Sequence, residues 1–188
     1  MFRSTALGLA AFLCLVSAPS AADDIETALE AALEAYRAGD IARAREEVDF
    51  AATLIGQLKA EGLQSFLPAP FDGWTREAGD TSSQALAGFG GGAVATAEYR
   101  SGGESVEITL MADNQLVASM AVMLSNTALM SSMGQVKRRG RQTYVVTHEG
   151  DVQALVDGRV MVQVTGSAAR ASKEAYFDLI DIEGLGEF

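Results

Sequence analysis

Two prolines, Pro68 and Pro70, divide the sequence into stretches with different hydrophobic periods. Proline disfavours the helical region in the residue before it, so a helix cannot run through this segment. Before the prolines, apolar residues recur at helical spacing. After them glycine becomes frequent and apolar residues alternate with a period near two, which is typical of strands. The sequence therefore predicts a helical segment over 23–66 and an antiparallel α+β domain over 67–188.

Residues 1–22 have the pattern of a secretory signal peptide. Arg3 gives a positive start, an apolar run covers 6–16, and small residues lead to a cleavage site after the last residue of this segment. The apolar run is too short to cross a bilayer as a helix, which needs about 20 residues. Cys14 follows Leu13, whereas a lipoprotein signal has a small residue before its cysteine. We therefore expect an exported chain, periplasmic in a Gram-negative bacterium and secreted otherwise, with a retained N-terminal anchor as the alternative.

The charge balance and the scarcity of metal-binding residues exclude several classes of protein. Fourteen Lys and Arg against 25 Asp and Glu give a net charge of −11. Such a surface repels phosphate backbones, which argues against a nucleic-acid-binding role. One cysteine and one histidine exclude zinc fingers, Cys-ligated iron–sulfur clusters, disulfide scaffolds and a three-His zinc site. We expect no cofactor.

The segment 23–66 reads as a helical hairpin. Gly39 provides a C-cap for the first helix and Asp40 an N-cap for the second, and both apolar faces are rich in alanine. Residues 28–52, including the run ALEAYRAGDIARAREEVDFA, resemble a single helix pair of a tetratricopeptide repeat. A lone pair cannot bury its own apolar face. The resemblance therefore implies a helix pair packed on something else, which we expect to be the neighbouring domain, and the alternative is a peptide-binding or dimerising hairpin.

The domain over 67–188 reads as an antiparallel sheet with one inserted helix and one C-terminal helix. The alternation of apolar residues predicts short strands at 74–77, 93–100, 105–111, 135–138, 142–148, 152–156 and 160–165. Helical spacing predicts the inserted helix over 115–130 and the closing helix over 168–179. Such an order predicts a sheet covered by helices on one side.

The same order of elements resembles the Mog1/PsbP-type sandwich over residues 66–183. The resemblance rests on Trp74 in the first strand, the run GRQTYVV that opens a central strand, and the run VMVQVTG in the last strand. It implies an accessory or binding protein rather than an enzyme.

Lys137, Arg138, Arg139 and Arg141 form the densest basic cluster of this acidic chain. Four positive charges around a turn at Gly140 can meet an anionic lipid headgroup, a phosphate or an acidic partner surface. The alternative is that they pair with acidic residues of the same chain.

Met120, Met123, Met130 and Met133 recur along the inserted helix. Soft thioether sulfur suits copper(I), so these residues define a weak candidate metal site. Methionine at this spacing also fills irregular gaps in an apolar core, which is the simpler interpretation.

Three further patterns carry less specific signals. Glu98 and Glu107 fall on adjacent predicted strands, where two carboxylates permit hydrolase chemistry if they meet in an aromatic-lined cleft. His148 stands at a strand end, and the sequence contains no G-x-S-x-G nucleophile motif. The run GFGGGA at 88–93 matches a dinucleotide fingerprint formally, but it precedes a strand instead of opening a helix.

From the sequence we therefore expect an exported accessory or binding protein of unknown ligand that acts through protein–protein or anionic-ligand contacts. A protein partner is expected, and peripheral membrane contact and a homodimer stay open. The alternatives are a small carboxylate-dependent hydrolase and a methionine-based copper(I)-handling protein.

Overall fold

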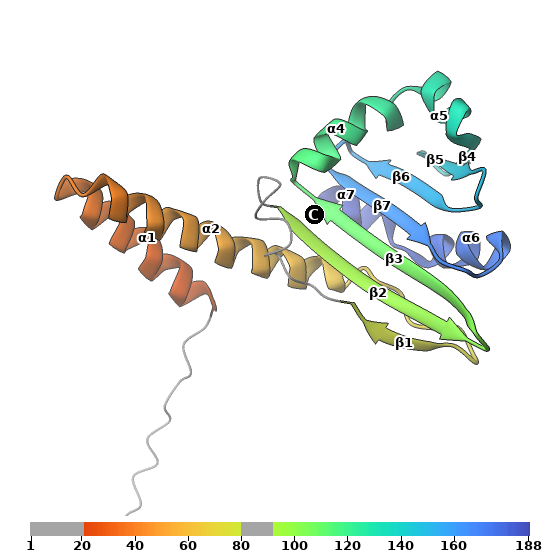
Figure 1. The fold of residues 1–188 in the computed structure, drawn as a ribbon, viewed down its shortest axis with the longest axis horizontal. Helices are drawn as coiled ribbons and strands as arrows, with labels where there is room; N and C mark the ends of the chain where they lie inside the picture. The colour runs from red at the N-terminus through yellow and green to blue at the C-terminus, as the bar shows by residue number, and fades with distance from the viewer. Residues whose placement is uncertain (1–20, 80–91) are drawn as a thin grey trace, which may run out of the picture.

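The computed structural model describes residues 21–79 and 92–188 (Figure 1). Residues 1–20 of the expected signal peptide and most of the glycine-rich run at 88–93 lie outside these residues, whereas its last two residues, Ala21 and Ala22, begin the first helix. The chain forms two N-terminal helices and then a seven-stranded antiparallel sheet with further helices, which confirms the α+β class. In chain order the elements are α1 (Ala21–Arg37), α2 (Ile41–Gln64), β1 (Thr75–Ala78), β2 (Ala93–Ser101), β3 (Glu104–Ala112), α4 (Gln115–Leu124), α5 (Thr127–Met133), β4 (Gly134–Arg139), β5 (Gln142–Thr147), β6 (Val152–Val156), β7 (Val160–Thr165), α6 (Arg170–Leu179) and α7 (Ile182–Glu187).

The sheet has the strand order β1-β2-β3-β7-β6-β5-β4, and every neighbouring pair is antiparallel. The chain leaves the sheet after β3, crosses through α4 and α5 to the far edge, and returns strand by strand to pair β7 with β3 (Figure 1). Each strand lies within two residues of its predicted range. The β2–β3 turn consists of Gly102 and Gly103, whose φ angles of +57° and +95° favour glycine.

Helices cover both faces of the sheet, so the expectation of coverage on one side was wrong. The main core joins one sheet face to the end of α2, to α6 and to α7, with Tyr99, Tyr176 and Phe177 as its largest buried side chains. The other face carries a smaller core under α4 and α5. Alternation along β7 supplies both cores, since Val160, Val162 and Val164 face the first and Met161 faces the second.

The inserted helix predicted over 115–130 is broken into α4 and α5, whose axes differ by 96°. The break comes from Asn126. Its side chain accepts hydrogen bonds from Ala128 N at 2.9 Å and Leu129 N at 3.4 Å, which caps a new helix. Hydrophobic spacing continues across the break, and this continuity explains why the pattern reads as one helix.

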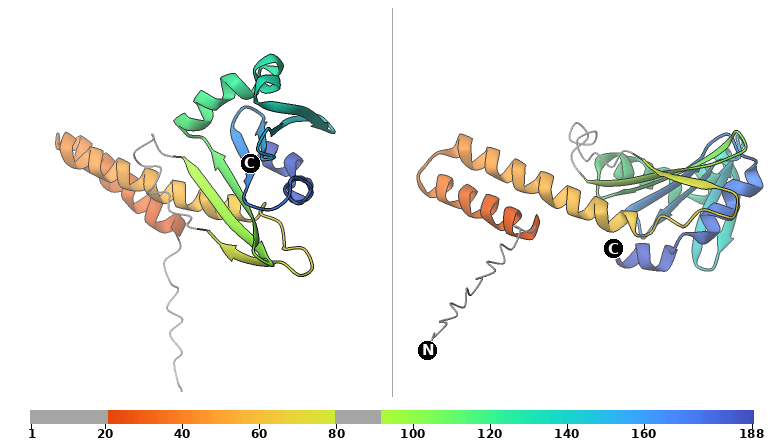
Figure 2. Two further views of the ribbon diagram at one scale, coloured as in Figure 1. Left: turned by 45° about the vertical axis from the view of Figure 1, so that its right-hand side comes forward. Right: turned by 90° about the horizontal axis from the view of Figure 1, so that it is seen from below.

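The hairpin of α1 and α2 projects from one end of the sheet domain, as both views of Figure 2 show. As expected, Gly39 has a positive φ of 82°, and the Asp40 carboxylate accepts from Arg43 N at 3.1 Å. The far end of α2 belongs to the main core through Ala60 and Leu63. The hairpin is therefore anchored at its base, while the turn between its helices points away from the sheet.

Candidate binding surfaces

In a self-contained helix pair the large apolar side chains are buried between the helices, whereas in this hairpin the small ones are buried and several large ones are exposed. Small residues are buried where α1 meets α2, namely Ala28, Ala32, Ala35, Ala44 and Ala51. Larger apolar residues remain in contact with water on one side of that seam, namely Leu29, Leu33, Tyr36, Ile41 and Val48, and we call these five residues the hairpin face. Tyr36 and Ile41 are 65% and 61% exposed. Because exposed clusters of large apolar side chains are uncommon in monomers, the hairpin face is a candidate contact surface.

The hairpin face surrounds a groove of about 470 Å³. Ala32 and Ala44 line the groove together with the five larger side chains, and Arg45 adds a charge to it. Arg45 also forms an exposed ion pair with Asp49 at 3.6 Å. The helical repeat places Leu29, Leu33 and Tyr36 on one stripe of α1.

The hairpin is strongly acidic. Residues 21–64 contain ten Asp and Glu against four Lys and Arg, which leaves a charge of −6. Arg43 and Arg45 form ion pairs with acids one turn further along α2, at 3.8 and 3.6 Å. The groove is therefore apolar inside and set in an acidic helix pair.

The basic cluster is divided between the two faces of the sheet. Lys137 Nζ donates to both carboxylate oxygens of Glu174 at 2.9 Å. Arg139 donates to the carbonyl oxygens of Phe177 and Ile180 at 2.5 Å, and its guanidinium lies 5.4 Å from the centre of the Phe177 ring. Lys137 thus holds the middle of α6 to β4, and Arg139 holds its C-terminal end.

The other two basic residues of the cluster stay exposed. Arg138 alternates with Lys137 and Arg139, so it lies on the sheet face that carries α4 and α5. Arg141 follows the turn and lines a hollow of about 320 Å³ with residues of the α4–α5 bend, including Leu124 and Met130, and with Asp157. Strand alternation thus separates a sequence cluster into two internal and two external charges.

Burial raises the pKa of Glu174, but hydrogen bonds from Lys137 and Arg170 outweigh it, so the carboxyl has a pKa below its ordinary value. Desolvation raises the pKa of Tyr144, which packs on Phe177 at 4.6 Å beside the same contacts. Both groups lie where α6 attaches to the sheet beside β4, and their contacts hold α6 in place.

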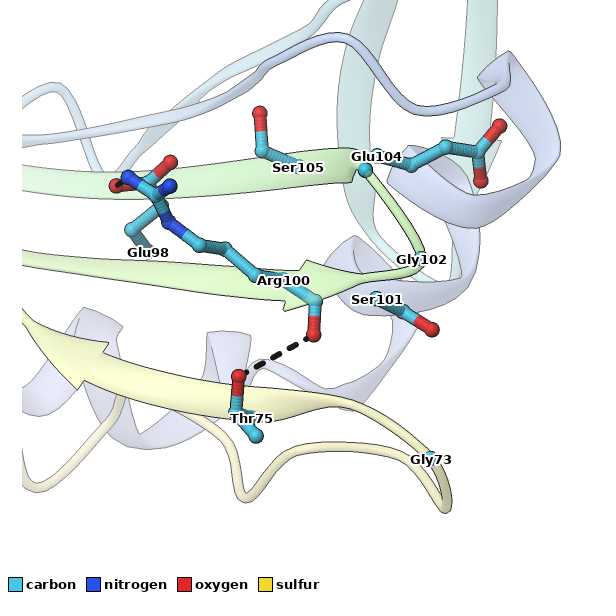
Figure 3. A pocket seen from close by; sticks show the side chains of 9 residues that line it. Gly73, Thr75, Glu98, Arg100, Ser101, Gly102, Glu104 and Ser105 are labelled. Carbon is cyan, nitrogen blue, oxygen red and sulfur yellow. Dashed lines mark hydrogen bonds and ion pairs between the residues drawn. The ribbon is translucent and has the colours of Figure 1, made fainter.

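Glu98 of β2 and Glu107 of β3, the two candidate carboxylates of the hydrolase alternative, are paired in the register of these strands. On the other side of β2, Glu98 is paired with Glu77 of β1. Arg100 NH2 donates to Glu98 Oε2 at 2.7 Å, and this hydrogen bond raises the pKa of the arginine. A polar hollow of about 460 Å³ lies at this end of the strands (Figure 3). None of the described residues that line it is aromatic, and Glu104 points away from Arg100.

The methionines gather in the smaller core. Met120, Met130 and Met133 pack there with Met111 and Met161 of the sheet, whereas Met123 is exposed. This arrangement matches the packing interpretation of their spacing. Among the residues that the structure describes, no group of three or more His, Cys, Asp or Glu side chains is arranged to hold a metal ion.

His148 is exposed at the end of β5, and its backbone N–H donates to Met133 O at 3.3 Å. Within 21–79 and 92–188, no single helix is long and apolar enough to span a membrane, although the bent pair α4 and α5 passes that test on combined length and composition.

Sequence reasoning missed two buried polar groups. Lys173 is almost fully buried and binds Asp151, a pairing for which neither local sequence gives a signal. Gln153 Oε1 is buried in the smaller-core face without a hydrogen-bond partner among the described atoms, next to Gln163 in the register of β6 and β7.

Comparison of the chain with protein-family models, with curated proteins and with solved structures found no match. Fold and surfaces together define an α+β protein with a seven-stranded antiparallel sheet and a projecting helical hairpin.

Proposed function

We propose that this protein is an exported accessory protein that binds a partner protein through the hairpin face, and that the partner presents a basic amphipathic helix. The proposal rests on the inverted packing of the hairpin, where alanines fill the seam while Leu29, Leu33, Tyr36, Ile41 and Val48 stay exposed. The seam is already closed, so these larger side chains do not serve the packing of α1 on α2. Covering them with a partner removes their apolar area from water.

The shape of the groove supports a helix as the occupant. Leu29, Leu33 and Tyr36 form one ridge at spacings of four and seven residues, and Ile41 and Val48 form the other at a spacing of seven. A third helix that lays its apolar stripe between two such ridges makes the contacts of helix-in-groove recognition. The alanines at the floor of the groove let that helix approach closely.

The charge of the hairpin supports a basic partner. With −6 over residues 21–64, two copies of the hairpin repel each other, whereas a helix flanked by Lys and Arg gains favourable long-range attraction. A partner of opposite charge is therefore a better occupant than a second copy.

The Mog1/PsbP-type resemblance agrees with a binding role, as does the peptide-binding alternative for the hairpin, and both stay predictions. The hydrolase alternative has less support, because Glu98 accepts a hydrogen bond from Arg100 and the adjacent hollow is lined by non-aromatic side chains in the part of the chain that the structure describes. The copper(I) alternative has less support as well, because Met123 lies apart from the buried methionines.

A direct test uses synthetic 18-residue peptides as probes, measured by fluorescence anisotropy. One peptide carries leucine at helical spacing with lysine elsewhere, a second replaces lysine by glutamate, and a third scrambles the lysine peptide. We expect the patterned basic peptide to bind and the other two to bind at least about tenfold more weakly. Leu33→Glu with Val48→Glu should reduce binding of the basic peptide by at least about tenfold, since both substitutions put charge into the groove.

The matched control is Val122→Glu, an apolar-to-acid change at a more exposed position on α4, which should leave peptide binding unchanged. Equal binding of the patterned and scrambled basic peptides would show that only net charge is sensed and would contradict the proposal. A dimer in sedimentation velocity that disappears in the Leu33→Glu, Val48→Glu variant would assign the groove to a second copy and would also contradict it.

A further inference from the structure

The helix pair α4 and α5 belongs to the longest charge-free stretch of the chain. Residues 114–136 contain no Asp, Glu, Lys or Arg, in a protein in which 21% of residues are charged. Such a stretch is ordinarily buried on all sides, because a helix that is apolar all round has no natural solvent face. Here the residues that the structure describes cover one side and leave the other exposed.

The inner side of the pair forms the roof of the smaller core. Val117, Leu124 and Met130 are buried there. The outer side carries four large apolar residues that remain in contact with water, Leu116, Val122, Met123 and Leu129, and we call these the α4–α5 face. Val122 is 70% exposed, the highest value among the large apolar residues of the described chain.

The serine hydroxyls on this helix pair are already hydrogen-bonded within it. Ser119 donates to Leu116 O at 2.7 Å, Ser131 to Thr127 O at 2.8 Å, and Ser132 to Leu129 O at 2.7 Å. All three serines of α4 and α5 therefore bond to backbone carbonyls of their own helix. Removing them from water costs less than removing free hydroxyls, which suits an apolar environment.

Two exposed arginines stand beside the pair. Arg138 lies on the same sheet face as Val136, which packs under the helices. Arg141 lines the hollow next to the α4–α5 bend. Asp157 lines the same hollow and offsets part of this charge. A guanidinium next to an apolar face can reach anionic groups while its stem stays in apolar contact.

From these observations we propose that the α4–α5 face docks on the surface of a lipid bilayer that contains anionic lipids, with the four apolar side chains in the boundary region and Arg138 and Arg141 at the headgroups. The hollow beside these apolar residues is mostly polar and offers a peptide little apolar area, so the face is suited to a broad deformable apolar phase more than to a narrow peptide. The helices have ten and seven residues, about 15 and 10 Å, so they enter shallowly. This inference does not depend on the role of the hairpin face.

The experiment is flotation of the full chain with vesicles of phosphatidylcholine alone and of equal parts phosphatidylcholine and phosphatidylglycerol. We expect flotation with the mixed vesicles and much less with phosphatidylcholine alone. Val122→Glu with Leu129→Glu should reduce the bound fraction by at least about tenfold. Arg138→Gln with Arg141→Gln should also weaken binding to the mixed vesicles by about 25-fold, at roughly fivefold per arginine, without changing binding to phosphatidylcholine alone.

The matched control is Leu33→Glu with Val48→Glu, the same chemical change on the hairpin face, which should float as the unchanged protein does. A second measurement avoids acidic substitutions. A polarity-sensitive dye is attached to Val122→Cys or to Val48→Cys, with Cys14→Ser removing the chain's own cysteine. The dye emission should shift to the blue on adding mixed vesicles when the dye is at position 122 and should not shift when it is at position 48. Absence of flotation, equal loss in the hairpin variant, or no shift at Val122 would overturn the proposal. A dimer in vesicle-free solution that the Val122→Glu, Leu129→Glu variant abolishes would assign the face to a second copy instead.

Discussion

Lys173 Nζ lies 2.6 Å from Asp151 Oδ1 and ties α6 to the residue that precedes β6. The lysine is only 3% exposed, and its ammonium also donates to Gly166 O at 3.3 Å. A buried ammonium group is tolerated when a carboxylate and further hydrogen bonds replace its water. The position of α6 over the sheet, and with it Tyr176 and Phe177 in the main core, therefore depends on this pair.

Lys173→Met tests that dependence because it keeps the apolar stem and removes the charge. We expect a loss of about 3 kcal/mol in the free energy of unfolding, measured by urea denaturation, since Asp151 is left without its cation. Lys137→Met is the control. The Lys137 ammonium of β4 also pairs with a carboxylate at α6, that of Glu174, but it is more exposed, so the expected loss is under about 1 kcal/mol. Equal losses in the two variants would show that burial of Lys173 does not matter.

Asp113 joins two elements that are far apart in the sequence. Its carboxylate accepts from Lys59 of α2 at 2.7 Å and from Arg159, in the turn before β7, at 2.9 and 3.1 Å. Hydrogen bonds from Arg159 and then Lys59 lower the pKa of Asp113 below its ordinary value of 3.8. A carboxyl whose pKa is lowered by folding stabilises the fold above its unfolded-state pKa and loses that contribution as the pH falls through the folded value.

Asp113→Asn should therefore reduce stability by about 1 kcal/mol at pH 7, because the contact is partly exposed. The difference from the unchanged protein should shrink from about pH 4 downward and vanish once the carboxyl is protonated. Urea denaturation across a pH series measures this difference, with Glu104→Gln at the exposed first position of β3 as the control. A difference that stays constant down to pH 2 would contradict the electrostatic explanation.

The sequence predicted elements well where one physical signal dominates locally. The strands were placed to within two residues, because alternation along β3 and β6 and glycines such as Gly102 and Gly103 define strand and turn together. The hairpin caps Gly39 and Asp40 were predicted for the same reason. These signals need only neighbouring residues.

The remaining features depend on contacts between distant segments. The break at Asn126 is a competition between hydrophobic spacing, which continues through it, and a side-chain cap that spacing alone does not reveal. The basic cluster looked like one surface, but Lys137 and Arg139 are used by α6, which lies more than 30 residues further along the chain. Likewise, helical spacing identified the apolar residues of the hairpin without indicating that alanines would be buried and leucines exposed.

Tyr99 offers a test at alkaline pH. Its hydroxyl donates to Pro68 O at 2.7 Å, and burial, partly opposed by Arg76 and reinforced by Tyr176, raises its pKa to about 12. A phenol whose pKa is raised by folding stabilises the fold fully below its unfolded-state value of about 10 and loses that contribution as the pH rises through the folded value.

In an ultraviolet titration, Tyr99→Phe should remove one phenol from the phase near pH 12 without changing earlier ionisation. The same variant should lose about 1 kcal/mol of stability at pH 7 through the missing hydrogen bond to Pro68. Its stability should then fall less steeply than that of the unchanged protein between pH 10 and 12. Loss of a phenol from an earlier phase would contradict the raised pKa.

Gly134 determines how α5 joins the sheet. Its backbone is extended, with φ of 166°, so its need for glycine comes from space: a Cβ there would lie 2.1 Å from Val146 O of the paired strand β5. Gly134→Ala must therefore push β4 away from β5 or shift the end of α5, and we expect a loss of about 3 kcal/mol in the free energy of unfolding. Gly140→Ala is the control in the turn after the same strand, where a Cβ meets nothing within 4 Å and the cost comes only from its φ of +57°. That cost should be about 1 kcal/mol. If urea denaturation gives equal losses for the two alanine variants, the close approach to Val146 does not hold the α4–α5 pair against the sheet.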